Sequence, residues 1–594
     1  MASDSTKVIY EFGPFHVDLE RYLLLRDDKS IPISPKVFET LVFLIQHRGE
    51  AVKKDDLMSK IWPDTYVEES NLAQNIFLLR KSLGEDKTEH RYIITIPGVG
   101  YRFVAPVVES FASPLQKPTA PQAAVSVESV HSIAVLPFKN LVREAGDEFL
   151  GPGIADALIM RLSSIRRLQV RPTTAVLKYG DAMHDPVVIG RELNVDALLD
   201  GVYQRIGEQI RVSVQLVSVT NGLTLWATRF DENFTNIFAI QDSIAEHVVR
   251  SLALKLSGDE RNQLTKSYTD NAEAFQLYIK GRYCWNQRTI EGVKKGLEYA
   301  QQAIAIDPTY APAYIGLADS YNLLGAQHSV LPPSESFPKA RAAIIRALEI
   351  DEGLAEAYAS LAFINCCFEW DWRTAEQNYL KAIALKPNYS TAHHWYGELL
   401  ITAARFAEGF VQLRMAQELD PLSLAINADL AAAFYYAREY ERSEKQLENL
   451  LELNPSFCRA RVLLARVWEQ KGRHGEALEM LRTTGNNPIT LSALAHTLAV
   501  AGNNREAEKI LDELQQWMNR RYVSAGNIAT IYIGLDQKEL AFEWLEKGAE
   551  NKDVELVWLK VSPLFDPLRD DPRFTKLLER VNPVLPATSS TQAP

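Results

Sequence analysis

Residues 70–83, SNLAQNIFLLRKSL, combine amide and basic side chains with a regular apolar pattern. Four aliphatic residues recur at helical spacing and predict one buried stripe: Leu72, Ile76, Leu79 and Leu83. At about 100° per residue, the opposite face and its edges carry Ser70, Asn71, Gln74, Phe77, Leu78 and Lys81. Amides match adenine edges, and a lysine matches guanine or a phosphate. The pattern predicts a helix that contacts the major groove of DNA.

Other residues whose types could support binding or catalysis give weaker signals. The Gly-Pro-Gly run at 151–153 precedes a helical pattern, where free amides could bind an anion. No Lys-Ser or Lys-Thr pair follows it, so a simple turn is favoured. His393 and His394 are adjacent and point about 100° apart on a helix, so no metal site is predicted. With no Ser-His-Asp or Cys-His arrangement, we predict no catalysis and no cofactor.

Length and composition indicate a modular protein of the reducing compartment. A chain of 594 residues exceeds the size of one hydrophobic core, so we expect three or more structural units. The net charge of −12 excludes a protein that coats nucleic acid along its whole surface. The four cysteines show no zinc or disulfide spacing, and Cys366 and Cys367 are adjacent. No signal peptide or long apolar run is visible, which favours a cytoplasmic protein that does not enter a membrane.

Residues 271–580 contain an internal repeat. Prolines that end helical patterns stand at Pro308, Pro387, Pro421, Pro455 and Pro488. From Pro387 onward their spacings are 34, 34 and 33 residues. The gap before Pro387 fits two repeats if Glu352 replaces a proline and residues 331–338 are an insert. Helix pairs of this period cannot bury their apolar stripes alone, so stacking predicts a continuous superhelix.

This repeat resembles the tetratricopeptide family through Gly397, Ala375, Ala382, Ala416 and the prolines. The resemblance implies a concave groove that binds a protein or peptide, with a simple spacer as the alternative. Family helices present certain positions toward the groove, and here these are His394, Glu398 and Tyr435.

A linker rich in Pro, Ala and Ser, ASPLQKPTAPQAAVSVES, precedes residues 131–258. These residues alternate predicted strands, such as SIAVLPF and QIRVSVQLVSV, with helices such as IADALIMRLSSI, and they predict an α/β domain. The LPF start and the segment LNVDALLDGVYQRIGEQIRVSVQLV resemble the TolB-like domain. That family implies assembly or sensing with no reaction attached, and a hidden enzyme is the alternative that turnover or bound nucleotide would reveal.

Residues 1–108 place strands on both sides of a helical centre. The segments SPKVFETLVFLI, RGEAVKKDDLMSKIW, NLAQNIFLLRKSLG and YIITIPGVGYRF follow the order of the OmpR/PhoB-type winged-helix domain. The resemblance implies a DNA-binding α+β fold with residues 70–83 as recognition helix and residues 97–100 as the wing tip. It also implies candidate phosphate contacts at Trp62, Asn75, Arg80, Thr95 and Tyr101.

Three positions, in two places, depart from that family. Phe77 and Leu78 stand where family members often carry basic residues, and Pro97 stands where an arginine is common. The apolar pair could contact thymine methyl groups. Acidic residues also outnumber basic ones, 16 to 14, in residues 1–108. A winged helix that only contacts proteins therefore stays an alternative.

The resulting prediction is a cytoplasmic, one-component transcriptional regulator of the bacterial CadC-like type. It binds double-stranded DNA, and its signal or protein partner is sensed by the TolB-like and repeat regions. A homodimer would raise weak single-domain affinity. The alternative is a repeat scaffold whose winged helix mediates protein contacts. The predicted boundaries are 1–108, winged helix; 109–130, linker; 131–258, α/β domain; 271–580, repeats; and 581–594, disordered tail.

Overall fold

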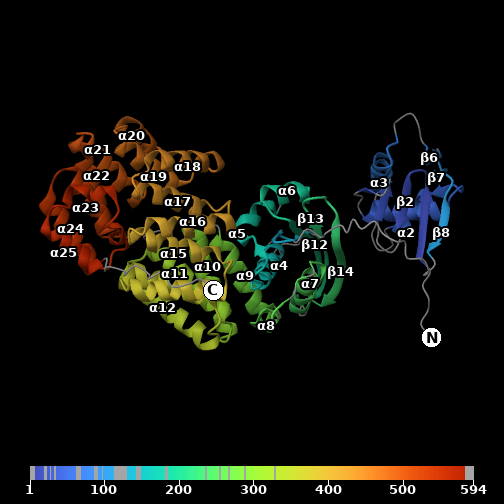
Figure 1. The fold of residues 1–594 in the computed structure, drawn as a ribbon, viewed down its shortest axis with the longest axis horizontal. Coiled ribbons are helices and arrows are strands. Elements are labelled where there is room, and N and C mark those ends of the chain that lie inside the picture. Colours follow the sequence, from blue (N-terminus) through green and yellow to red (C-terminus); the bar gives the residue numbers. More distant parts are fainter. Residues whose placement is uncertain are drawn as a thin grey trace. The chain divides into compact units, whose positions relative to one another are not determined.

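The computed structural model forms two compact units, one made mostly of residues 1–128 and the other mostly of residues 129–594. Figure 1 shows the strands and helices of both. The residues that the structure describes are 7–18, 23–26, 29–31, 35–61, 69–85, 91–96, 98–112, 130–141, 149–180, 185–233, 237–252, 254, 256–264, 266, 268–286, 289–326 and 330–581.

The first unit contains two antiparallel sheets. The larger sheet has the order β4-β3-β2-β1-β8, and the smaller one has the order β5-β7-β6. The strands of the larger sheet are β1 (Lys7–Phe12), β2 (Phe15–Asp18), β3 (Leu23–Arg26), β4 (Lys29–Ile31) and β8 (Val108–Ala112). Those of the smaller sheet are β5 (Val52–Lys53), β6 (Ile93–Ile96) and β7 (Gly100–Phe103). Because β8 pairs with β1, residues 109–112 belong to this fold and not to the predicted linker.

Three helices complete the first unit: α1 (Pro35–Gln46), α2 (Lys54–Ile61) and α3 (Glu69–Ser82). The three helices and both sheets pack around one hydrophobic core. Phe12, Phe15 and Phe103 from the strands are buried there with Leu41 of α1 and Leu79 of α3. Phe12 lies 5.1 Å from Phe103 in an edge-to-face contact between ring centres. The helices are therefore fixed to the sheets by their apolar faces.

The second unit begins with a mixed sheet of the order β11-β9-β12-β13-β14. β11 and β9 run parallel to their neighbours, and the long β12, β13 and β14 pair antiparallel. The strands are β9 (Ser132–Val135), β10 (Lys139–Asn140), β11 (Gln169–Val170), β12 (Ala197–Ile206), β13 (Gln209–Ser218) and β14 (Thr224–Asn233). The helices are α4 (Leu150–Leu162), α5 (Thr173–Val176), α6 (Pro186–Glu192), α7 (Ile237–Ser251) and α8 (Gly258–Leu264). The predicted α/β class of this region is confirmed.

The glycines at 151 and 153 do not form a turn before α4, as the sequence suggested, but lie in its first turn. A Cβ atom on Gly151 would lie 1.8 Å from the carbonyl oxygen of Phe138, and one on Gly153 would lie 2.1 Å from a methyl carbon of Ile279. Only glycine allows backbone and neighbouring side chains to approach this closely. Close packing of α4 explains both glycines.

The remainder of the second unit is an all-helical repeat array, in which successive helices pack in pairs (Figure 1). The pairs are α9 (Ala272–Asn286) with α10 (Ile290–Ile306), α11 (Ala311–Gly325) with α12 (Pro333–Ile350), α13 (Ala355–Ile364) with α14 (Trp372–Leu385), α15 (Ser390–Thr402) with α16 (Phe406–Leu419), α17 (Leu424–Tyr436) with α18 (Tyr440–Leu453), α19 (Cys458–Gln470) with α20 (His474–Arg482), α21 (Pro488–Val500) with α22 (Asn504–Trp517), and α23 (Ala525–Gly534) with α24 (Lys538–Glu550). The predicted tetratricopeptide-like architecture is confirmed.

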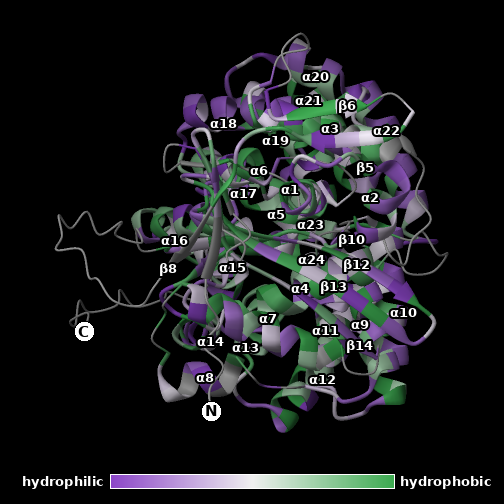
Figure 2. Cartoon of the chain, turned by 90° about the vertical axis from the view of Figure 1, so that its right-hand side faces the viewer, coloured by the Kyte–Doolittle hydropathy of each residue, from purple (hydrophilic) through white to green (hydrophobic). Residues whose placement is uncertain are grey.

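The two helices of a pair differ in burial. Ten consecutive residues of α17, from Ile426 to Tyr435, are buried, whereas α18 buries only Ser443, Leu447 and Leu450. Figure 2 accordingly shows α18 largely in the hydrophilic colour. The array ends with the short helices η4 (Val554–Trp558) and η5 (Pro563–Leu568) and with α25 (Pro572–Val581). Residues 582–594, most of the predicted tail, lie outside the described residues.

The sheet domain and the repeats share one core instead of forming separate domains. Helix α4 packs on α9, and Phe275, Tyr278 and Ile279 of α9 belong to the same buried cluster as the sheet residues. Arg171 connects the two parts, because its guanidinium donates to the carbonyls of Leu193 and Asn194 and to that of Leu419 in α16. Throughout the described residues, every helix is too short or too polar to span a lipid bilayer.

Candidate nucleic-acid interface

Helix α3 is anchored on one side, as its apolar spacing predicted. Leu72, Ile76, Leu79 and Leu83 are all at most 2% exposed and pack in the core of the first unit. Leu83 directly follows the helix, and its amide donates to the carbonyl of Leu79, which extends the helical pattern. The predicted buried stripe is therefore confirmed.

The other side of α3 exposes an apolar pair and a cation. Phe77 is 56% exposed and Leu78 is 37% exposed, while Lys81 is also exposed. These three side chains lie on the face of α3 that the sequence predicted to contact DNA. The side chains of Ser70, Asn71 and Gln74 lie outside what the structure describes, and Trp62 lies outside the described residues altogether.

Asn75 connects α3 to α1 inside the fold. It is 9% exposed, and its side-chain amide donates to the hydroxyl of Thr40 at 3.3 Å. The hydroxyl of Thr40 in turn donates to the carbonyl of Lys36 at 2.6 Å. This chain of hydrogen bonds fixes the angle between the two helices. The role of Asn75 as a phosphate contact stays a prediction.

Arg80 is engaged with the β6–β7 hairpin. Its guanidinium donates to the carbonyl of Ile93 at 3.0 Å and to the hydroxyl of Thr95 at 2.9 Å. It also lies 3.5 Å from the carboxylate of Glu85, which accepts hydrogen bonds from the amides of Tyr92 and Ile93. Arg80 and Glu85 together position the hairpin beside α3. Of the two neighbouring cations, only Lys81 points into solvent.

The β6–β7 turn forms the candidate wing tip. Gly98 has φ of +72°, a conformation that glycine adopts without strain, and Val99 is 39% exposed. Thr95 is exposed at the start of the turn, whereas Tyr101 is 7% exposed after it. Pro97 lies outside the described residues. The hairpin therefore offers small and apolar groups at its tip.

The repeat residues predicted to bind a partner are buried or nearly so. His394 is 7% exposed, and its Nε2 donates to the carboxylate of Asp429 at 2.8 Å. Glu398 belongs to the same group, whose ligand atoms lie within 4.8 Å of one another. This spacing could suit a cation, but the guanidinium of Arg459 contacts Asp429 and lies 3.9 Å from Glu398. A positive charge is therefore already present beside both carboxylates.

The chain's own C-terminal segment packs over this part of the array. Trp558 of η4 stacks on Tyr436 with ring centres 4.6 Å apart. Arg438 donates to the carbonyl of Val561, and Lys560 donates to that of Ala403. Tyr435 is fully buried in a cluster with residues of α17, α18 and α19. A direct partner contact by Tyr435 stays a prediction that requires local opening.

The His394 cluster predicts a pH-dependent stability. Burial and the charge of Asp429 raise the pKa of Glu398 to about 7. Burial opposes protonation of His394, but the hydrogen bond to Asp429 and the two carboxylates raise its pKa overall. The folded state thus holds these protons more tightly than the unfolded state does. Stability from this cluster is greatest at low pH and falls as pH rises through about 7.

Glu398→Gln should therefore raise the melting temperature at about pH 8, where wild type carries a buried carboxylate, and leave it nearly unchanged at about pH 5. Differential scanning calorimetry of the full chain at both pH values measures this. Glu418→Gln, an exposed neighbour on α16, is the matched control and should change neither value. Equal shifts at the two pH values would contradict the assignment.

Two families of known proteins match this chain, one in the first unit and one in the second. The family described as "Transcriptional regulatory protein, C terminal" matches residues 28–103, which span α1 to β7. This unit contains an OmpR/PhoB-type winged-helix domain. The HilA/YgeH-like transcriptional regulator second domain matches residues 129–247. The TolB-like resemblance of the second region stays a prediction, because the matching family carries a different name.

Relatives extend the similarity beyond the OmpR/PhoB-type domain. Transcriptional regulator HilA of Salmonella typhimurium is 25% identical over 562 residues, 93% of this chain and 95% of that protein. The relative of Rhizobium meliloti named "Putative adenylate cyclase 3" is 29% identical over 187 residues, 32% of each chain. The solved DNA-binding domain of Escherichia coli CadC is 30% identical and covers 18% of this chain and 98% of that domain, with a TM-score of 0.16.

Sequence reasoning did not find Glu85 and Thr40, which position the OmpR/PhoB-type helix α3. Glu85 binds two backbone amides of the hairpin, and Thr40 holds Asn75. Glu85 gives no signal by itself, because its partners are backbone amides seven and eight residues away, at the start of the hairpin, and any residue type carries such an amide. A buried threonine on the apolar face of α1 was the one available hint.

Proposed function

We propose that this chain is a sequence-specific, DNA-binding transcriptional regulator whose helix α3 enters the major groove. One observation carries the proposal: α3 is fixed by a completely buried stripe while Phe77, Leu78 and Lys81 remain exposed on its other side. The two matched families support it, since both are described as transcriptional regulators. Similarity to HilA across most of both chains agrees with a regulator of the same organisation.

The proposed contacts divide into base and backbone recognition. Phe77 and Leu78 meet thymine methyl groups, and Lys81 contacts guanine or a phosphate. Arg80 and Asn75 keep α3 and the hairpin in position and reach phosphates only if their internal hydrogen bonds exchange. The remaining candidates are assigned by resemblance alone: Trp62, Ser70, Asn71, Gln74, Thr95 and Tyr101.

The rest of the chain is proposed to carry regulation and not catalysis. The protein acts in the cytoplasm, and a protein or peptide partner binds the repeat array. Dimerisation would place two winged helices on adjacent half-sites and multiply a weak single-domain affinity through effective concentration. The acidic balance of residues 1–108 favours this arrangement, because one domain alone offers few cations to phosphates.

Lys81→Ala should weaken binding of the full chain to promoter-upstream DNA and reduce the magnitude of its salt slope by about 1, since one phosphate contact is lost. Arg80→Ala should also weaken binding, but by loosening the hairpin, so it lowers the melting temperature as well. Fluorescence anisotropy across a salt series, with calorimetry alongside, separates the two effects.

Lys445→Ala, which removes an equal charge from exposed α18, is the control and should leave DNA binding unchanged. Salt-independent association, or equal effects of Lys81→Ala and Lys445→Ala, would reject DNA binding through α3. A chain that binds no DNA above background would instead be a repeat scaffold whose winged helix contacts proteins.

A further inference from the structure

A cavity of about 710 Å³ lies where the sheet domain meets the first repeats. Its wall comes from α4, α7 and α9 and from the ends of α11, α13 and α14. Cavities of this size at such junctions are where proteins commonly hold small molecules. The cavity belongs entirely to the second unit and is separate from the DNA interface.

Gln241 of α7 is a buried polar residue in the wall of this cavity. Its side chain is 1% exposed and lines the cavity, and neither its amide nitrogen nor its amide oxygen has a hydrogen-bond partner among the described residues. Leaving both atoms unpaired is unfavourable for the folded state. Its neighbour Asp242, in contrast, pairs with Arg161 of α4, which fixes the position of α7 at this wall.

Three tyrosine side chains line the same cavity. Tyr278 and Tyr310 meet edge to face with ring centres 5.1 Å apart, and Tyr268 lines the same space. Burial raises the pKa of Tyr278 and Tyr310 far above the ordinary value, so their hydroxyls stay neutral. Rings of this kind stack on or edge against a planar ligand.

The charged residues of the wall are mostly paired, and two are not. Lys386 binds Glu356 at 2.8 Å, and Lys266 binds Asp351 at 2.8 Å. Arg166 and Arg167 line the cavity and are exposed, and among the described residues neither side chain forms a close ion pair, although Arg166 interacts electrostatically with Glu260 of α8 in the same wall. An exposed guanidinium without a close ion-pair partner can bind two carboxylate or phosphate oxygens at once, through two parallel N–H donors.

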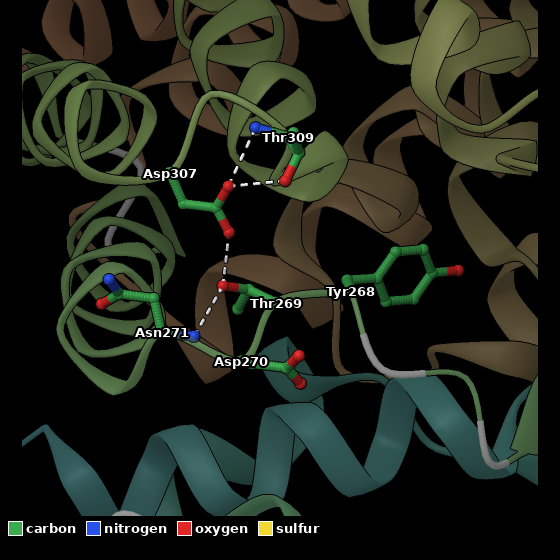
Figure 3. Close-up of a pocket in the computed structure, with 6 residues that line it drawn as sticks. All are labelled: Tyr268, Thr269, Asp270, Asn271, Asp307 and Thr309. Carbon is green, nitrogen blue, oxygen red and sulfur yellow. Dashed lines mark hydrogen bonds between the residues drawn. The ribbon is translucent and has the colours of Figure 1, made fainter.

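A neighbouring hollow differs from this cavity, because its polar groups bind one another (Figure 3). There the carboxylate of Asp307 accepts hydrogen bonds from the hydroxyl of Thr269 at 2.6 Å and from the amide and hydroxyl of Thr309 at 2.9 and 2.6 Å. The hydroxyl of Thr269 also accepts from the amide of Asn271. These polar groups satisfy one another and join the start of α9 to the end of α10, so the hollow is structural.

We propose that the cavity binds a small nucleotide, with the base edge on the amide of Gln241 among the tyrosines and the phosphate toward Arg166 and Arg167. A glutamine amide presents one donor and one acceptor side by side, as a purine edge requires. Stacking on tyrosine suits any base. The site goes beyond DNA binding, and its test uses no DNA, so failure here leaves the proposed regulator function untouched.

The test measures the melting temperature of the purified full chain with adenosine, guanosine, cytidine and uridine 5′-monophosphates, with adenosine, and with inorganic phosphate. At least one monophosphate should raise the melting temperature, or a nucleotide should be released on denaturation and be detected by mass spectrometry. Adenosine and inorganic phosphate should each bind at least tenfold more weakly than the preferred monophosphate.

Gln241→Leu should fold at least as stably as wild type, because it removes two unpaired buried atoms, and should lose nucleotide binding by at least tenfold. Arg167→Ala should weaken binding, whereas Arg191→Ala, an exposed arginine on α6 and outside the cavity wall, should not. The proposal is overturned if no nucleotide is bound or released, if inorganic phosphate binds as tightly, or if Gln241→Leu binds like wild type.

Discussion

Arg171→Met is expected to destabilise the second unit by about 3 kcal/mol, because several buried backbone carbonyls lose their donor. Arg171 is 3% exposed and donates to backbone carbonyls on both sides of the junction, Leu193 and Asn194 in the sheet domain and Leu419 in the repeats. Burial lowers the pKa of Arg171, and the charges of Asp420 and Asp196 oppose this. Methionine fills a similar volume but leaves those carbonyls without a donor.

Urea unfolding of the full chain, followed by circular dichroism, measures the effect. The variant should also separate one cooperative transition into two, because the hydrogen bonds of Arg171 to the end of α16 are lost and only weaker polar contacts, such as that of the Thr174 hydroxyl with Asp420, still join the two parts there. Arg191→Met, on exposed α6, is the matched control and should unfold like wild type. Coincident unfolding curves of Arg171→Met and wild type would refute the role of Arg171.

Gly100→Ala is expected to destabilise the winged helix by about 3 kcal/mol, at the upper end of overpacking effects. A Cβ atom at Gly100 would lie 2.0 Å from the carbonyl oxygen of Val52, so β5 and β7 would have to separate. DNA affinity of the full chain should fall about tenfold or more, because the hairpin and α3 share this core. Anisotropy titration at a series of temperatures measures the loss.

Gly98→Ala is the informative comparison for that prediction. Its Cβ would meet nothing within 4 Å, but its φ of +72° makes alanine strained by about 1 kcal/mol. Gly98→Ala should thus reduce affinity much less than Gly100→Ala. If the two variants bind DNA equally, lack of space at Gly100 does not matter and the hairpin tolerates a shift.

The sequence predicted those features that depend on periodicity. The spacing of Leu72, Ile76, Leu79 and Leu83 identified the buried face of α3, and a 34-residue period identified the helix pairs. Both patterns are local, because every turn or every repeat meets the same environment. The exposure of the Phe77 side chain follows from the same helical spacing, which places it opposite the buried stripe.

Features that depend on contacts distant in sequence could not be predicted. Nothing in the chain near Tyr435 indicates that Trp558 and Val561 pack over this part of the array, because the bond from Arg438 to Val561 spans 123 residues. Arg171 and Leu419 are 248 residues apart. Asn75 was assigned to a phosphate by resemblance to the OmpR/PhoB-type domain, and only the position of α1 shows that its side-chain amide donates to Thr40 inside the fold.

The contact between α4 and α9 has a practical consequence for work on fragments. A repeat array needs a polar surface on its outermost helix to stay soluble. Here α9 turns Phe275, Tyr278 and Ile279 toward the sheet domain. A fragment that begins at Asn271 would leave those side chains in water, so it would aggregate or demand detergent. A well-behaved fragment that contains α9 should therefore start before β9.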